Sequence, residues 1–216
     1  DSWFVTFNDT LTIPQINIGR LPAKNLAQFQ HYFQKHKNYF EQGYDKWNKS
    51  YLLISGGKKE SEQELSKNVN DQIRNESVIP PPVAGFYGQL YATSNPETNF
   101  GPFPDVYVDS LFDAGGIIIS YIGHSGTKEW DNGIEDPRQL SNSRNKNSFI
   151  SDFGCSTGKF AEPDVVPFAE QLINGLNGQA IGYIGNSSLG FISTSISVPQ
   201  IFYNNILQKG YHTISE

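Results

Sequence analysis

Apolar and polar positions along the chain occur in blocks that predict strands and helices in turn. Short, continuously apolar runs predict strands at residues 3–7, 13–19, 50–57, 80–93, 117–123, 148–154 and 179–188. Longer segments of helical spacing or composition predict helices at 25–43, 60–75, 105–116, 163–178 and 197–210. Because most of the predicted strands are apolar throughout, we expect helices on both faces of the sheet.

This order of elements predicts a single α/β unit with a largely parallel sheet. Strands and helices alternate along most of the chain, as they do in parallel α/β proteins. No internal repeat is visible, and no linker is long enough to divide the sequence. The polar ends of the parallel strands are therefore the first place to look for a functional site.

Two of the predicted strands end on residues with catalytic potential. The stretch GGIIISYIGHSG, residues 115–126, contains His124 just after its apolar run. The stretch NSFISDFGCSTG, residues 147–158, contains Cys155, the single cysteine of the chain, at the equivalent place. Neighbouring parallel strands end at the same edge of a sheet, about 4.8 Å apart. We therefore expect the two side chains close together, each after a glycine that permits a sharp turn.

A thiol beside an imidazole can act as a nucleophile with its base. A helix predicted shortly after Cys155 would favour the thiolate if its N-terminus pointed at the sulfur. Backbone N–H groups at the glycine-flanked turns can receive the oxyanion of a tetrahedral intermediate. The alternative interpretation is a buried, inert cysteine and a histidine that only hydrogen-bonds within its turn.

Composition and charge narrow the classes of partner and cofactor. The chain has 216 residues and a net charge of −6 without a basic cluster, so nucleic acid is not an expected partner. No apolar run reaches the roughly 18 residues that span a bilayer. One cysteine excludes an internal disulfide and a multi-cysteine zinc site. We expect no metal at the catalytic residues and no cofactor for catalysis.

At these residues the sequence resembles the gingipain-like cysteine peptidases, family C25 of the caspase-like clan. The resemblance rests on YIGHSG followed by a tryptophan, and on FGCSTGKF. The segments INIGRLPAKN, LLISGG and AIGYIGNSS support it. Together these matches span roughly residues 16–210.

The resemblance implies a caspase-like three-layer α/β sandwich with a largely parallel central sheet. It implies a catalytic dyad of His124 and Cys155. It also implies an oxyanion hole, for which we expect the backbone N–H groups of Ser125 and Cys155. The substrate-binding candidates that it implies are Asn186, Ser187 and Ser188.

The sequence departs from the family pattern beside the first glycine pair. Family members carry an acid just before this pair to support the histidine, whereas this chain has Ser55 there. The activity would then rest on a dyad, or the orienting acid would come from elsewhere. In gingipains an acid after the pair sets basic-residue specificity. Glu60, Glu62 and Glu64 lie in that segment, and the exposed face of a helix is the favoured interpretation for each.

The implied function is a cysteine endopeptidase that hydrolyses peptide bonds through a Cys155 thioester, in a secreted or surface-displayed bacterial protein. Two alternatives stay open: a sortase-like transpeptidase of a secretion system, and a catalytically inactive caspase-like interaction module. The implied partners are a polypeptide substrate and other domains of a longer parent chain. We expect residues 1–216 to be a catalytic domain that lacks an N-terminal subdomain.

A structural calcium ion is a further expectation drawn from related peptidases. The candidate ligands are the loop acids Asp131, Glu135 and Asp136. Carboxylates are suitable ligands for calcium, although solvated surface acids are the favoured interpretation here.

Overall fold

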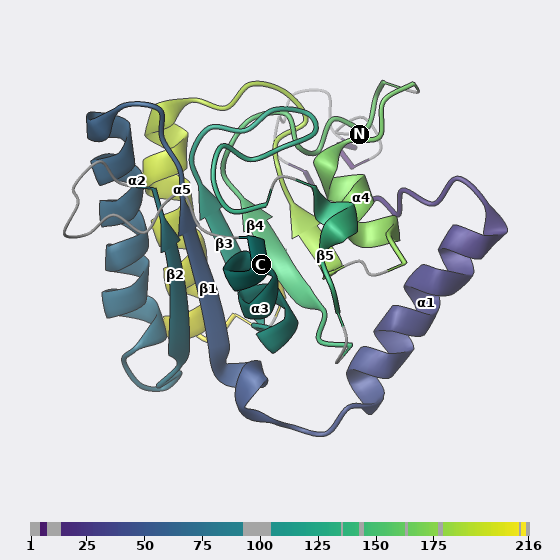
Figure 1. Ribbon diagram of the computed structural model, residues 1–216, viewed down its shortest axis with the longest axis horizontal. Helices are drawn as coiled ribbons and strands as arrows, with labels where there is room; N and C mark the ends of the chain where they lie inside the picture. Colours follow the sequence, from purple (N-terminus) through teal and green to yellow (C-terminus); the bar gives the residue numbers. More distant parts are fainter. Residues whose placement is uncertain are drawn as a thin grey trace.

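A parallel sheet of five strands lies at the centre of the molecule, in the order β2-β1-β3-β4-β5 (Figure 1). The computed structural model describes residues 5–7, 14–92, 105–134, 136–142, 145–162, 164–176, 179–211 and 213–214. The strands are β1 (Ser50–Ser55), β2 (Phe86–Tyr91), β3 (Ile118–Ile122), β4 (Ser148–Asp152) and β5 (Ala180–Ile184). All of them fall inside segments predicted as strands.

Helices cover both faces of this sheet. They are α1 (Leu26–Glu41), α2 (Glu60–Ile73), α3 (Asp105–Ala114), α4 (Phe168–Asn174) and α5 (Ile192–Gln208). Shorter helical turns occur at Lys46–Lys49, Arg74–Val78 and Pro137–Gln139. No helix in the described part of the chain is long and apolar enough to cross a membrane.

Two apolar clusters fill the space between the sheet and the helices on its two faces. Ile54 packs with Phe112 in the cluster that joins the sheet to α3 and α4. Leu53, the preceding residue, packs with Val69 in the cluster that joins the sheet to α2 and α5. Successive residues of a strand point to opposite faces, so a fully apolar strand supplies both clusters. The predicted α/β architecture with helices on both faces is confirmed.

Several predicted elements differ from the structure in type or in extent. Residues 14–19 form no strand, and Ile16 and Ile18 are each 51% exposed. The strand predicted at 3–7 lies largely outside the described residues. The sequence predicts the last helix from residue 197, but α5 begins at Ile192 and contains Pro199. Proline lacks the N–H donor and its ring crowds the carbonyl of the preceding turn, so Pro199 costs α5 one hydrogen bond, although the helix continues on both sides of it.

Three glycines bring the carboxyl ends of β1, β3 and β4 into close contact. A Cβ at Gly123, after β3, would lie 2.8 Å from the Cα of Gly56, which follows β1. A Cβ at Gly154, after β4, would lie 2.1 Å from the Ser125 Oγ. Only glycine permits these approaches. They place the loops that carry His124 and Cys155 against each other.

Candidate active site

His124 and Cys155 follow neighbouring strands and line the same cavity. β3 and β4 pair in parallel, with Tyr121 opposite Asp152 near their carboxyl ends. The cavity has a volume of about 260 Å³ and lies between α2, the strand ends and the start of α5. The structure therefore brings the two predicted residues to one site at one edge of the sheet.

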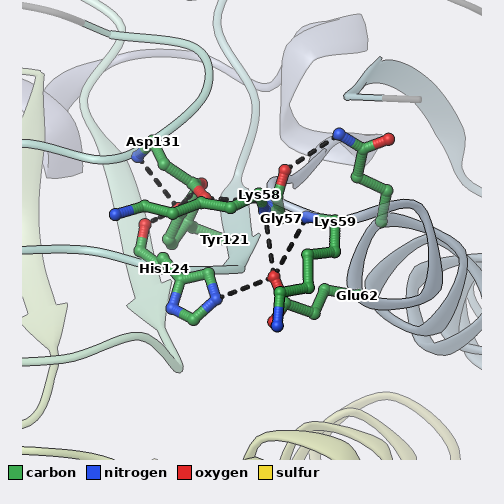
Figure 2. A network of polar contacts seen from close by, with 8 residues as sticks. Gly57, Lys58, Lys59, Glu62, Tyr121, His124 and Asp131 are labelled. Atoms are coloured by element: carbon green, nitrogen blue, oxygen red, sulfur yellow. Dashed lines mark hydrogen bonds and ion pairs between the residues drawn. The ribbon is translucent and has the colours of Figure 1, made fainter. Parts of the chain in front are cut away.

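Glu62 on α2 hydrogen-bonds the ring of His124 (Figure 2). The Glu62 Oε2 lies 3.1 Å from the His124 Nε2. The same oxygen accepts the backbone N–H groups of Lys58 and Lys59, at 3.1 and 3.2 Å. The hydrogen bond from His124 holds the pKa of Glu62 below its usual range. An ionised carboxylate therefore supports the imidazole.

The supporting acid thus comes from the helix after the glycine pair. Ser55, before the pair, is fully buried and does not line the cavity. Glu60 and Glu64 are exposed, as predicted, but the same prediction is wrong for Glu62, whose side chain is 26% exposed. Glu62 is the third residue of α2 and accepts the N–H of the N-cap residue Lys59, but a lysine at the N-cap is not the Ser or Thr that would mark a capping box in the sequence.

A second carboxylate, Asp131, ties the loop after β1 to the loop after β3 (Figure 2). Its Oδ1 accepts the Tyr121 hydroxyl at 2.5 Å, and its Oδ2 accepts the Gly57 N–H at 3.0 Å. The Asp131 N–H donates to the His124 carbonyl oxygen at 3.0 Å. Burial, with the charge of Asp131, raises the pKa of Tyr121 well above its usual value, so the phenol stays a donor. These contacts fix the backbone of His124.

The loop acids considered for calcium do not gather into one site. Asp131 is engaged as above, and Asp136 pairs with the Arg138 guanidinium at 2.7 Å. Hydrogen bonds from Arg138 hold the pKa of Asp136 below its usual range. Glu135 lies outside the described residues. No group of three potential metal ligands occurs among the residues that the structure describes, and structural calcium stays a prediction.

A buried carboxylate, Asp152, anchors the turn that carries Cys155. Its side chain accepts four hydrogen bonds, from Gly154 N–H (2.7 Å), Thr157 Oγ1 (2.5 Å), Trp130 Nε1 (2.8 Å) and Tyr183 Oη (2.6 Å). Burial raises the pKa of Asp152, and the hydrogen bonds oppose that shift by favouring the ionised form. Because Gly154 and Thr157 flank the cysteine, these bonds fix the turn. No motif in the sequence indicates this role of Asp152.

The thiol of Cys155 lies beside the start of α5. Its Sγ accepts the Gly190 N–H at 3.3 Å, just before that helix begins. The helix predicted at 163–178 begins at Phe168, later in the chain than the sequence indicates, and the cavity that Cys155 lines includes no residue of it. Ser156 has a φ of 59°, in the left-handed region, which turns the chain sharply after the thiol.

The hydroxyl of Ser125 contacts both backbone groups of Cys155. The Ser125 Oγ accepts the Cys155 N–H at 2.5 Å and donates to the Cys155 carbonyl oxygen at 2.8 Å. One of the two N–H groups expected in the oxyanion hole is therefore engaged in this structure. The Ser125 N–H has no hydrogen-bond partner within the described residues. The sequence predicts a role for that N–H and none for the hydroxyl.

The predicted substrate-binding residues lie beside the Cys155 turn without lining the cavity. The Asn186 Nδ2 donates to the Gly154 carbonyl oxygen at 2.6 Å, and the Ser188 carbonyl oxygen accepts the Ser156 N–H at 2.9 Å. Ser187 is exposed. The cavity wall is formed instead by the residues that follow, Gly190, Phe191 and Ile192. Substrate binding by Asn186, Ser187 and Ser188 stays a prediction.

Comparisons with known proteins agree on one family and one fold. The sequence profile of peptidase family C25 matches residues 1–216. The crystal structure of the Arg-specific cysteine proteinase gingipain R (RgpB) superposes with a TM-score of 0.72 at 20% identity, over 97% of this chain and 48% of that one. No curated protein matches the chain.

Two further solved structures are similar. A complex of the pro- and mature domains of RgpB from Porphyromonas gingivalis gives a TM-score of 0.57 at 19% identity, over 83% of this chain and 41% of that one. A structure described as "Structure of Protease" gives a TM-score of 0.59 at 16% identity, over 82% of this chain and 35% of that one. The chain spans less than half the length of each of these proteins. The caspase-like fold expected from the sequence is confirmed.

Proposed function

The chain belongs to peptidase family C25, and on this premise we propose that it is a cysteine peptidase with Cys155 as nucleophile and His124 as base. One observation carries the proposal: both residues line one cavity from neighbouring strand ends, and a carboxylate supports the imidazole. A thiol, an imidazole and an orienting acid are the groups that acyl transfer through a thiolate requires.

The reaction begins when the Cys155 thiol passes its proton to His124. Because the Nε2 of His124 contacts Glu62, the Nδ1 is the nitrogen that takes the proton. The sulfur bonds to the scissile carbonyl carbon, and the electron pair moves to the carbonyl oxygen. The Ser125 N–H donates a hydrogen bond to this oxyanion. The Cys155 N–H joins it once the Ser125 hydroxyl rotates away.

Collapse of this intermediate breaks the peptide bond. His124 gives its proton to the leaving amine, which departs, and the acyl group stays on Cys155 as a thioester. A water molecule then gives a proton to the same imidazole and attacks the thioester carbon. The acid product leaves, and the sulfur recovers the proton from His124. One imidazole thus serves as base and acid in both halves of the reaction.

Replacement of the nucleophile tests the proposal. The variant Cys155→Ala is expected to lower the cleavage rate of an unfolded protein substrate by at least about 10³-fold, because no thioester can form. The matched control is Ser197→Ala, an exposed position on α5 that does not line the cavity. Circular dichroism establishes that both variants are folded. Cleavage that survives in the Cys155→Ala variant would show that another residue is the nucleophile.

The products distinguish hydrolysis from transfer. Mass spectrometry in the presence of an added amine is expected to show free carboxyl termini. An amide conjugate in their place would identify a transpeptidase. A protein that cleaves no peptide, and whose Cys155 reacts with iodoacetamide no faster than the cysteine of an unfolded peptide, would be an inactive interaction module.

We also propose a secreted or surface location in a bacterium, and a longer parent chain with further domains. Support comes from gingipain R, whose structure is about twice the length that this chain covers, and from the complex of RgpB pro- and mature domains. The polypeptide substrate follows from the proposed peptidase activity. That residues 1–216 lack an N-terminal subdomain stays a prediction.

A further inference from the structure

The cavity beside Cys155 has a mostly apolar wall. Its apolar side chains come from α2, β3 and the start of α5: Leu65, Val69, Ile122, Phe191, Ile192 and Ile196. Its volume of about 260 Å³ is below the range of about 300–1,000 Å³ that is typical of sites for drug-sized ligands. The space therefore suits a single large side chain.

The position of the thiol identifies which side chain can enter. The Cys155 sulfur attacks the carbonyl carbon of the residue before the scissile bond. The Cα of that residue is bonded directly to the attacked carbon, so its side chain starts only two bonds away. A cavity that has the attacking sulfur in its wall is therefore within reach of this side chain.

The charges around the cavity do not suit a basic side chain. Glu62 is the single acidic residue among the described residues that line it. One oxygen of this carboxylate already accepts hydrogen bonds from His124, Lys58 and Lys59. An Arg or Lys side chain inserted past Glu62 would lose its hydration among apolar groups without a dedicated carboxylate.

The rim of the cavity continues this apolar surface. Phe191 and Ile192 are 73% and 64% exposed, although both line the cavity. Leu189, separated from Phe191 by Gly190, is 77% exposed. Exposed apolar side chains that adjoin a cavity mark a surface that a ligand covers. The start of α5 therefore presents apolar area that a substrate side chain can bury.

Resting on the cysteine peptidase function proposed above, we propose that this cavity binds an apolar side chain, such as Leu, Met or Phe, of the residue that precedes the scissile bond. Gingipain R is described as Arg-specific. The present chain shares its fold but presents Leu65, Val69 and Ile196 where a buried cation would need a free carboxylate.

Peptides that differ only at this one residue test the proposal. Fluorogenic substrates with Leu, Phe, Arg, Lys or Asp before the scissile bond are compared by kcat/KM. We expect Leu and Phe to exceed Arg and Lys by at least about 10-fold, the discrimination typical of an apolar pocket. Preference for Arg or Lys, or equal rates for all five peptides, would overturn the proposal.

A charge introduced at the rim provides the sharper test. The variant Ile192→Glu adds a carboxylate at an exposed residue of the cavity wall, so the fold should tolerate it. We expect the Arg to Leu ratio of kcat/KM to rise about 10-fold, as for a close ion pair in a partly desolvated site. The control Ile201→Glu makes the same change on the same helix, 59% exposed and away from the cavity, and should leave the ratio unchanged. An equal ratio in both variants would contradict the assignment.

A binding measurement separates this inference from the catalytic proposal. Acetylated peptides that end in Leu or Arg are titrated into the Cys155→Ala variant by calorimetry. Tighter binding of the Leu peptide supports the apolar pocket even if the protein cleaves nothing. Equal or tighter binding of the Arg peptide refutes the pocket assignment and leaves the roles of His124 and Cys155 untouched.

Discussion

At the scale of single residues, one oxygen atom of Glu62 sets the orientation of the imidazole. The two backbone N–H groups at the start of α2 hold this oxygen, and the same oxygen accepts from the ring of His124. The backbone donors need no side-chain ordering, so the carboxylate is fixed before a substrate arrives. In the proposed mechanism, the positive charge that His124 gains from the thiol proton forms beside an ionised acid.

Removing this charge tests the role of Glu62 directly. The variant Glu62→Gln keeps an oxygen for the backbone donors but carries no charge, so we expect kcat/KM to fall about 10- to 100-fold. The matched control is Glu64→Gln, which removes an exposed charge from the same helix and should change little. Peptide cleavage assays at pH 7 give the comparison. Equal activities of the two variants would mean that Glu62 does not assist His124.

His124 and Cys155 could be predicted from the sequence, whereas their partners could not. An apolar run that ends in Gly and a reactive side chain fixes both the strand and the position of its tip, so simple sheet geometry places the two residues together. Glu62 reaches His124 across 62 positions of sequence, and this contact depends on how α2 lies over the sheet edge. The Ser125 hydroxyl bond to Cys155 likewise depends on close packing of two loops at Gly154.

At the scale of elements, Asp152 joins the end of β4 to the neighbouring strand β5. The Tyr183 hydroxyl of β5 donates to Asp152 at 2.6 Å, and Thr157, after the cysteine, donates to the same oxygen. A buried carboxylate is tolerated only when several donors satisfy it. The turn around Cys155 therefore depends on a hydrogen bond from outside its own segment.

Removing one donor from this carboxylate should weaken the fold in a pH-dependent way. The variant Tyr183→Phe is expected to lose about 2 kcal/mol of unfolding free energy at pH 7, the usual contribution of a hydrogen bond to a charged group. The donor stabilises the ionised form, so its contribution is lost as the pH falls and Asp152 takes up a proton. Since burial raises the pKa of Asp152, the loss begins above the usual value of 3.8.

The control for this prediction is the same substitution at a neutral acceptor. The Tyr32 hydroxyl donates to the Ile181 carbonyl oxygen at 3.3 Å. Tyr32→Phe should therefore cost about 1 kcal/mol or less, without a dependence on acid pH. Urea unfolding between pH 4 and 7 measures both variants. Parallel pH profiles for the two variants would argue against an ionised Asp152 at the centre of the network.

The five strands of the sheet were predicted correctly from their apolar runs. The sequence does not show which apolar run lacks a partner strand, nor where the last helix begins. The run at 13–19 has the composition of a strand, but its described part finds no neighbour in the sheet. α5 begins before the predicted start because Phe191 O accepts the N–H groups of Thr194 and Ser195 upstream of the proline. Whether an apolar run pairs with a strand depends on tertiary contacts that local composition does not encode.

At the scale of the whole molecule, the first helix is held by residues far along the chain. The Lys35 Nζ of α1 donates to the carbonyl oxygens of Ile173 and Ala180, at 2.5 and 2.9 Å. Ile173 lies in the last turn of α4 and Ala180 begins β5, so one ammonium group joins three elements. The sequence predicted the helix and the α/β class. It gave no sign that this lysine would be 6% exposed, because charged residues are rarely buried.

Burial of Lys35 predicts how the stability of the whole fold depends on alkaline pH. Burial lowers the pKa of Lys35 from 10.5 to about 8. Between these values the unfolded chain binds a proton that the folded chain does not, so the fold gains stability as the pH rises. Relative to Lys35→Met, which cannot titrate, the unfolding free energy of the wild type should increase by about 2 kcal/mol between pH 7 and pH 10. The buried tyrosines titrate in both proteins, so their effect cancels in this difference.

The control for this prediction is a lysine outside the core. Lys37→Met, at a half-exposed lysine of the same helix, should show a constant difference from the wild type. Urea unfolding at several pH values measures all three proteins. A flat or falling difference for Lys35→Met would mean that the ammonium group stays charged in the fold and is stabilised by its two carbonyl partners.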